Sequence, residues 1–227
     1  MLIPVAEQAN PGAPYLGAAR RARAALLDWN QGIGIDDDVS PPRSPAERGI
    51  SDPEAFFGTR HSVRDYKTLP APGELLTRAV ELAINTPSVC NRQSWHVRFY
   101  SDPADVTSVL QFQNGNVGMR PVPTVALVTV DTQLFGGIGE RNQGWIEGGL
   151  FSMSLVWAMH SLGLDTCMLN MSARNETTDR LRKHLDIDDG ELVIMMIAVG
   201  YGRDGHRRAR SVRRSTDEVL RTAVSRE

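Results

Sequence analysis

The sequence predicts an α+β fold, because apolar strand patterns and helical patterns follow one another without the regular alternation of a parallel α/β sheet. The clearest strand is 122–130 (VPTVALVTV), whose nearly continuous apolar run indicates burial on both faces. A second apolar run at 191–199 predicts another buried strand. At 227 residues the chain has room for one domain with a substantial core, or one domain plus an appendage.

The core of the fold is expected to begin at Ser51, where Ser, Asp and Pro are typical of a helix start. Pro87 ends a helix whose apolar residues recur at helical spacing. The expected helices lie at 51–58, 72–86, 102–113, 143–162 and 176–185, with a short one at the end of the chain. The remaining expected strands lie at 96–100 and 165–171.

The helix at 143–162 is the longest expected element, and one side of it mixes large and small residues. That side consists of Trp145, Gly149, Ser152, Val156, Met159 and Gly163. Small side chains let other backbones approach closely, so we expect a central helix, and a subunit interface is one role open to it. Gly163 is expected to end this helix, and Asn175 to cap the next.

Residues 1–50 differ in composition from the rest. A helix is expected at 17–30, with Leu26, Leu27 and Trp29 available for packing, and the Gly, Asp and Pro residues after it cannot continue a helix. Two alternatives stay open: an arm laid over the surface or onto a partner subunit, and a partly disordered leader. We therefore predict an extension at 1–50 and a single domain at 51–227.

Charge and cysteine usage narrow the class of protein. The chain has 25 Lys and Arg against 27 Asp and Glu, a net charge of −2, which argues against a non-specific nucleic-acid binder. Cys90 and Cys167 are isolated, as in proteins of a reducing compartment. The N-terminus does not resemble a signal peptide, and the longest apolar run, 192–199, is too short to span a membrane. We expect a cytoplasmic protein without a membrane or nucleic-acid partner.

Several motifs are weaker than they look. The segment 200–205 (GYGRDG) matches G-x-G-x-x-G after a strand, but no helix is expected after it, so a glycine-lined exit from an inner strand is the better interpretation. The five histidines lack zinc-like spacing, and no metal site is predicted. Ser88 and Cys90 lack the context of a nucleophile. With no catalytic side chain predicted, any chemistry would belong to a cofactor.

Two polar segments point to such a cofactor. The segment 87–95 (PSVCNRQSW) places amides and hydroxyls beside a tryptophan, which suits a flat ligand held by amides and walled by a ring. Upstream, the two cations and the hydroxyl of 60–64 (RHSVR) suit a phosphate. A planar ring and a phosphate together predict a nucleotide-like cofactor.

Four segments occur in a recognisable order: 60–66 (RHSVRDY), 87–95 (PSVCNRQSW), 163–167 (GLDTC) and 199–202 (VGYG). In this order and at these spacings they resemble the FMN-dependent nitroreductase family, over residues 51–227. The resemblance implies a central mixed or antiparallel sheet flanked by helices, in an intertwined homodimer with FMN at the subunit interface.

The resemblance also implies roles for individual residues. Arg60, Ser62 and Arg64 would hold the phosphate and ribityl chain, with His61 contributing. The flavin of the partner subunit would be lined by a second set, with Trp95 as support: Pro87, Ser88, Val89, Asn91 and Gln93. Asn114 or Asn116 would reach the pyrimidine edge of the ring. The backbone of Met168, Leu169 and Asn170 would lie near N5, and Arg213 would close on the phosphate.

The chain departs from the family pattern at two places. Ser211 occupies the first position of a tail pair that is often Lys-x-Arg, which leaves Arg208 or Arg210 as substitutes. Thr86 precedes Pro87 where alanine is common.

The implied activity is an oxidoreductase in which FMN takes a hydride from NADH or NADPH and passes two electrons to a small acceptor, of the nitroaromatic or quinone type. One alternative within the same fold is a dedicated biosynthetic reductase or dehydrogenase for one metabolite. Another, of a different class, is a flavin-binding protein without turnover. The set of Arg60, Ser62, Arg64 and Asn91 argues against the last.

Overall fold

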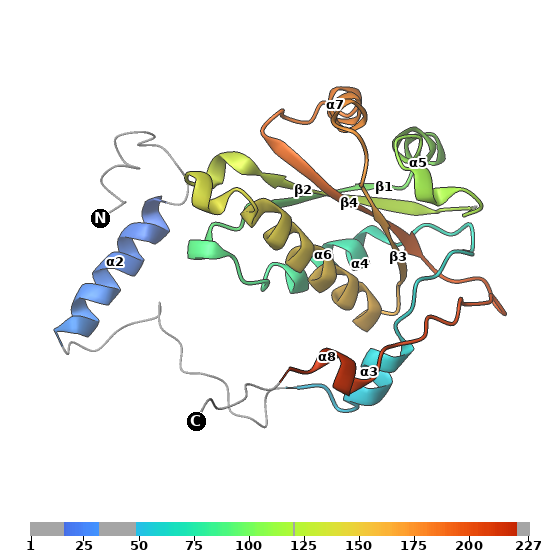
Figure 1. Cartoon of the computed structure of the whole chain (residues 1–227), viewed down its shortest axis with the longest axis horizontal. Helices are drawn as coiled ribbons and strands as arrows, with labels where there is room; N and C mark the ends of the chain where they lie inside the picture. Colours follow the sequence, from blue (N-terminus) through green and yellow to red (C-terminus); the bar gives the residue numbers. More distant parts are fainter. Residues whose placement is uncertain (1–15, 32–48, 120, 222–227) are drawn as a thin grey trace. The chain divides into compact units, whose positions relative to one another are not determined.

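The computed structural model describes residues 16–31, 49–119 and 121–221 (Figure 1). The chain divides into two compact units, Met1–Pro53 and Glu54–Glu227, and each is described by itself. In the first unit, α2 (Leu16–Asn30) confirms the helix expected at 17–30. Leu27 is about half exposed, while the side chains of Leu26 and Trp29 and the segment 32–48 lie outside the described residues. The proposed boundary at residue 50 stays a prediction.

The second unit is built on a four-stranded antiparallel sheet with the order β1-β2-β4-β3. The strands are β1 (Trp95–Tyr100), β2 (Thr124–Asp131), β3 (Asp165–Asn170) and β4 (Glu191–Gly200). The two inner strands, β2 and β4, are the two apolar runs of the sequence. Each is buried on both faces because the sheet has helices on both sides. An antiparallel sheet flanked by helices confirms the α+β prediction.

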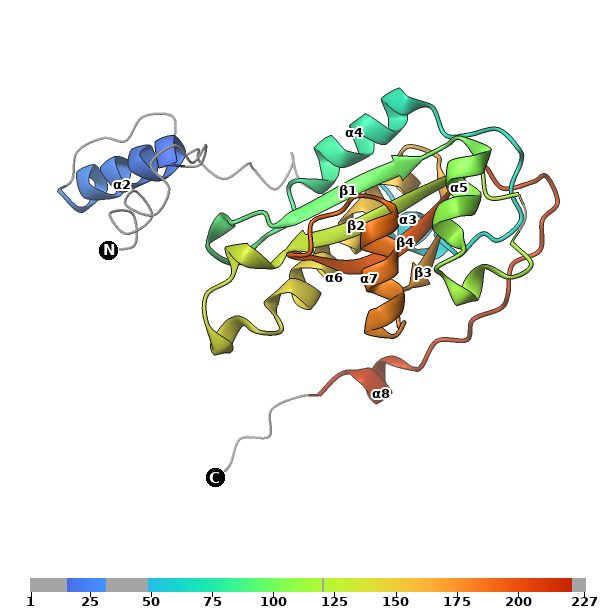
Figure 2. The same ribbon diagram turned by 90° about the horizontal axis from the view of Figure 1, so that it is seen from above.

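The helices form one layer on each face of the sheet (Figures 1 and 2). On one face, α4 (Gly73–Ala83) and α6 (Gln143–Ser161) pack through apolar residues against one side of β2 and β4. On the other, α5 (Pro103–Leu110) and α7 (Asn175–His184) pack against the opposite side. The short helices α3 (Pro53–Thr59) and α8 (Thr216–Val219) complete the described helices. No helix in the described part of the chain is long and apolar enough to cross a membrane.

The long helix α6 is central, as expected, but the predicted side was partly wrong. Ser152, Val156 and Met159 are buried, whereas Trp145 is 52% exposed. Gly148, not Gly149, makes the close approach to the sheet, because a Cβ at that position would lie 2.5 Å from Cγ1 of Ile194.

Helix ends were predicted with mixed success. Asp102 caps α5 by accepting a hydrogen bond from the Ala104 N–H at 2.8 Å. Gly163 follows α6 with φ +76°, which confirms it as the terminator. Asn175 does not cap α7: it is the first residue of that helix, Arg174 is the N-cap residue, and no side chain caps it.

The glycine motif at 200–205 is the exit from an inner strand, as expected. No helix follows it before α8. A Cβ at Gly200 would lie 2.5 Å from Cγ of Pro123 and 3.2 Å from Cδ1 of Tyr66. Close packing at the end of β4 therefore requires this glycine.

Candidate functional site

The segment 60–66 runs along the outer edge of β3. Ser62 forms an isolated parallel bridge with Thr166, and the Val63 N–H donates to the Thr166 carbonyl at 3.0 Å. Tyr66 is fully buried and donates its hydroxyl to the Ala198 carbonyl at 3.2 Å. Because Val63 and Tyr66 point into the core, the segment is fixed while the Arg64 side chain stays exposed. Arg60, Ser62 and Arg64 are thus displayed from one anchored edge.

Arg60 lies over an aromatic side chain of α6, which is itself packed on α3. Its guanidinium carbon lies 5.7 Å from the centroid of the Trp157 ring, a cation–π contact. Trp157 in turn stacks on Phe56 at a centroid distance of 5.1 Å. Thr59 contacts His160 of α6, with 3.1 Å between Oγ1 and Nε2. The guanidinium is therefore positioned by the second half of α6.

Cys167 on β3 lies beside the same cations. Burial raises the pKa of its thiol, and this outweighs Arg64, the Ser62 hydrogen bond and Arg60, which lower it. The thiol is 1% exposed and stays protonated at neutral pH. A buried, protonated thiol is not a nucleophile.

His61 faces His206, which follows the glycine motif. The two Nε2 atoms are 3.3 Å apart, and each Nδ1 lies close to a backbone carbonyl. Nothing in the sequence spacing pointed to this pair, whose members are 145 positions apart. It joins segment 60–66 to the start of the arginine-rich tail.

Loop 87–95 adopts an unusual backbone. Cys90, Asn91 and Gln93 have φ values of +52°, +53° and +50°, the left-handed region that residues other than glycine rarely occupy. The Ser88 hydroxyl accepts the Gln93 N–H at 3.0 Å, and the Gln93 amide donates to Asn91 Oδ1 at 3.2 Å. Asn91 and Gln93 are exposed, so the loop presents two amides outward from a strained turn.

Trp95 does not face outward with these amides. Its side chain is 7% exposed and stacks on Phe151 of α6, with centroids 5.1 Å apart and planes at 8°. The sequence suggested a ring that walls a ligand directly. In the structure this ring is part of the core, and it supports the loop from behind.

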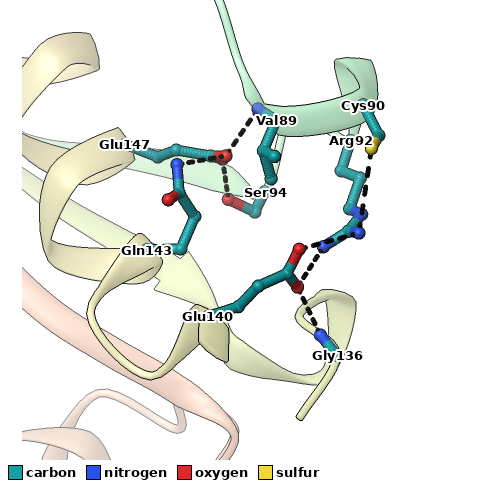
Figure 3. Close-up of polar contacts among 8 residues, drawn as sticks. All are labelled: Val89, Cys90, Arg92, Ser94, Gly136, Glu140, Gln143 and Glu147. Atoms are coloured by element: carbon teal, nitrogen blue, oxygen red, sulfur yellow. Dashed lines mark hydrogen bonds and ion pairs between the residues drawn. The ribbon is translucent and has the colours of Figure 1, made fainter. Parts of the chain in front are cut away.

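Glu147 of α6, which was not among the predicted site residues, is the main anchor of the loop. Its carboxylate, drawn with its hydrogen-bond partners in Figure 3, is fully buried. It accepts the Val89 N–H at 2.8 Å, the Ser94 hydroxyl at 2.8 Å and the Gln143 amide at 3.3 Å. A visible signal existed, since Glu147 is the one charged residue between Gln143 and Met159.

A second anchor holds the loop at its other end. Arg92 makes a bidentate ion pair with Glu140, at 2.6 and 3.1 Å, and Glu140 also accepts the Gly136 N–H (Figure 3). The hydrogen bonds from Arg92 and Gly136 hold the pKa of the Glu140 carboxyl below its usual value. Cys90 lies beside Arg92, with its sulfur 3.9 Å from a guanidinium nitrogen.

A cavity of about 230 Å³ lies between the turn after α5 and the end of β3. It is lined by residues 112–115 and 170–173, so the structure brings Asn114 and Asn170 together. The Gln113 amide donates to the Asn170 carbonyl at 3.0 Å. Asn116 points elsewhere and donates to the Leu110 carbonyl at 2.9 Å. Between the two asparagines that the sequence left open, only Asn114 borders the cavity.

The remaining predicted residues are less directly placed. Leu169 is buried in the core and Met168 is half-buried, so the backbone of β3 is what they offer to a ligand. Arg213 is exposed, and its guanidinium donates to the Ser211 carbonyl at 3.1 Å. The structure does not hold it at segment 60–66. Among the described residues, no group of three or more His, Cys, Asp or Glu side chains could hold a metal ion.

Comparison with known proteins gives relatives along most of this unit. A protein of Methanothermobacter thermautotrophicus, provisionally named NADH dehydrogenase/NAD(P)H nitroreductase, is 22% identical over 145 residues, which cover 63% of this chain and 73% of that protein. The structure of YdfN from Bacillus subtilis, provisionally named a nitroreductase, matches with a TM-score of 0.66 at 21% identity, over 74% of this chain and 97% of that chain.

A Desulfovibrio desulfuricans protein, also provisionally named a nitroreductase and solved in complex with FMN, matches with a TM-score of 0.65 at 20% identity, over 77% of this chain and 99% of that chain. These likenesses confirm the predicted fold. The model of the nitroreductase family matches residues 58–117 and 113–201, more than half of the sequence. Since the matched region contains segment 60–66, loop 87–95 and all four strands, this chain belongs to the nitroreductase family.

Proposed function

We propose that this chain binds FMN and acts as an NAD(P)H-dependent oxidoreductase on a small acceptor of the nitroaromatic or quinone type. The observation that carries the proposal is the anchored edge of β3, where Arg60, Ser62 and Arg64 project from one segment. Two guanidinium groups and a hydroxyl are the donors that a phosphate monoester prefers.

The donor set fits the two ends of FMN. The phosphate donors lie beside Thr166 and the polar cavity lies at Asn170, four residues along β3. That separation is about 13 Å at the rise of a β-strand, a span of the kind that the ribityl chain bridges between phosphate and ring. The cavity offers the amide of Asn114 and the backbone around Asn170 to a flat ring with polar edges.

We also propose a homodimer, in which loop 87–95 lines the FMN of the partner subunit. The outward side of α6 carries Trp145, Ile146 and Leu150, which are 52%, 52% and 45% exposed. Phe57 of α3 is 57% exposed. Large apolar side chains gathered on one helix favour an interface over contact with water.

FMN supplies the hydride acceptor and the two-electron carrier of this activity. The protein's own residues bind and orient it: Arg60 and Arg64 neutralise the phosphate, and loop 87–95 fixes amides beside the ring. No side-chain nucleophile is required, which agrees with the protonated state of Cys167. Two free cysteines, one of them exposed, are also consistent with a cytoplasmic location.

The test begins with the visible spectrum of the purified protein after addition of FMN. We expect a bound flavin that is reduced anaerobically by NADH or NADPH and reoxidised by a quinone or nitroaromatic. A protein that binds no FMN would refute the proposal, and a bound flavin that neither nicotinamide reduces would refute the reductase activity. Arg60→Ala should weaken FMN binding by roughly 10- to 100-fold, the cost of a lost charged hydrogen bond. The exposed Arg78→Ala, on α4, is the matched control.

A further inference from the structure

Each imidazole of the His61–His206 pair contacts a backbone carbonyl as well as the other ring. Nδ1 of His61 lies 2.9 Å from the Thr59 carbonyl, and Nδ1 of His206 lies 2.8 Å from the Arg203 carbonyl. A carbonyl oxygen only accepts, so each Nδ1 must carry a proton. In two neutral imidazoles both Nε2 atoms would then be bare acceptors, facing each other at 3.3 Å.

The arrangement of the two rings shows how the two Nε2 atoms face each other. The ring centroids are 5.6 Å apart, which is the 3.3 Å between the nitrogens plus one ring radius at each end, and the planes differ by only 19°. The rings therefore meet edge to edge with the two Nε2 atoms in line. An in-line pair suits a proton shared between the nitrogens, whereas two imidazoles on one tetrahedral metal ion would meet at an angle.

The charged surroundings of the pair are mixed. Arg60 and Arg64 flank His61 in the chain, and Arg207 follows His206. Asp165 of β3 accepts the Gly202 N–H at 2.7 Å, and a Cβ at Gly202 would lie 3.0 Å from this carboxylate and 2.7 Å from the His206 ring. Two ion pairs lie on the neighbouring residues, Arg203–Asp65 at 3.0 Å and Lys67–Asp204 at 2.8 Å.

We propose that His61 and His206 share one extra proton, and that His206 thereby belongs to the anion site of segment 60–64 as the holder of a third positive charge for a phosphate monoester. This inference rests on the proposed function. The two Nε2 atoms are occupied by each other and the two Nδ1 atoms by backbone carbonyls, so neither imidazole has an N–H left for the phosphate. The contribution is electrostatic, and it also ties the arginine-rich tail to the segment.

The test is the dependence of FMN affinity on pH, measured by fluorescence titration of the apoprotein. Raising the pH removes the shared proton, so a pH series compares the site with and without its extra charge. As the pH rises, we expect the affinity of the wild type for FMN to fall by roughly tenfold more than that of His206→Gln, the order of effect that one unit charge has near a protein surface. The titration of the FMN phosphate itself is common to both proteins and cancels.

Two controls and one independent measurement keep the outcomes apart. His96→Gln, an exposed histidine on β1, should behave like the wild type, and riboflavin, which lacks the phosphate, should show no such difference. If the affinity for FMN depends on pH equally in the wild type and His206→Gln, the inference is overturned although FMN still binds. The inference is also overturned if His206→Gln binds FMN weakly at every pH. Absence of FMN binding in all proteins would instead refute the proposed function. NMR of the ¹⁵N-labelled imidazoles, with His206→Asn as a second variant, tests the extra proton without any ligand.

Discussion

Removal of the Glu147 carboxylate should loosen loop 87–95 specifically. Glu147→Ala leaves the Val89 N–H and the buried Ser94 hydroxyl without their acceptor. Each donor left unsatisfied costs about 1–3 kcal/mol, so the loss of two should lower the free energy of unfolding by about 2–6 kcal/mol. Glu147→Gln keeps the shape and one acceptor oxygen but turns an amide toward a donor, and it should cost about 1–3 kcal/mol.

Urea unfolding measures the free energy, and hydrogen exchange locates the change. The amides of loop 87–95 should exchange faster in Glu147→Ala, while those of the inner strands β2 and β4 follow the global stability. Glu81→Ala is the matched control, because Glu81 is also a helical glutamate but forms an exposed ion pair with Arg78, which is worth less than about 1 kcal/mol. Unchanged stability in Glu147→Ala, or exchange that rises equally everywhere, would refute the anchoring role.

Two further predictions concern the surroundings of this anchor. Gly148→Ala should destabilise the protein by about 1–3 kcal/mol, because its Cβ would lie 2.5 Å from Ile194. Gly149→Ala has open space around it and should stabilise by up to about 1 kcal/mol, because alanine favours a helix interior over glycine. Thermal unfolding of the two variants compares them. Glu140→Gln should change how stability depends on pH. The ion pair with Arg92 lowers the pKa of Glu140 in the folded state, so its stabilisation is present above the ordinary value of about 4.3 and is lost as pH falls through the folded value. The variant should therefore be less stable than the wild type at neutral pH and equal to it in acid. Urea unfolding at several pH values tests this, and a difference in free energy of unfolding that stays constant with pH would contradict it.

The secondary structure was predictable because its signals are local. The apolar run at 122–130 became β2, buried on both faces, and the Asp102-Pro103 pair begins α5 with a side-chain cap. The order of the strands in the sheet and the hydrogen-bond partners of the site residues were not predictable from local signals. Glu147 bonds to residues 58 and 53 positions away, and His61 to one 145 positions away, so no window of the sequence contains both partners.

The error on α6 has a different cause. Large apolar side chains occur on every side of this helix, because one side packs on the sheet while Ile146 and Leu150 remain about half exposed. Hydrophobicity alone then does not fix which side is inward. Shape decides instead: Gly144 and Gly148, one helical turn apart, fit against Leu192 and Ile194 of β4. The rotation of the helix is therefore set by where a Cβ has no room.

One helix thus contacts both parts of the candidate site. The first half of α6 holds loop 87–95 through Glu147, and its second half holds Arg60 through Trp157, ten residues or about 15 Å further along. In the proposed homodimer the loop serves the partner's FMN, so α6 lies between the wall of one site and the phosphate donors of the other. Substitutions that affect the two halves of α6 should then have different effects on flavin binding. Arg60→Ala should weaken binding of FMN more than that of riboflavin, whereas Glu147→Gln should change the absorption of bound flavin and weaken both ligands alike. Equal behaviour of the two variants would mean that α6 does not divide the site in this way.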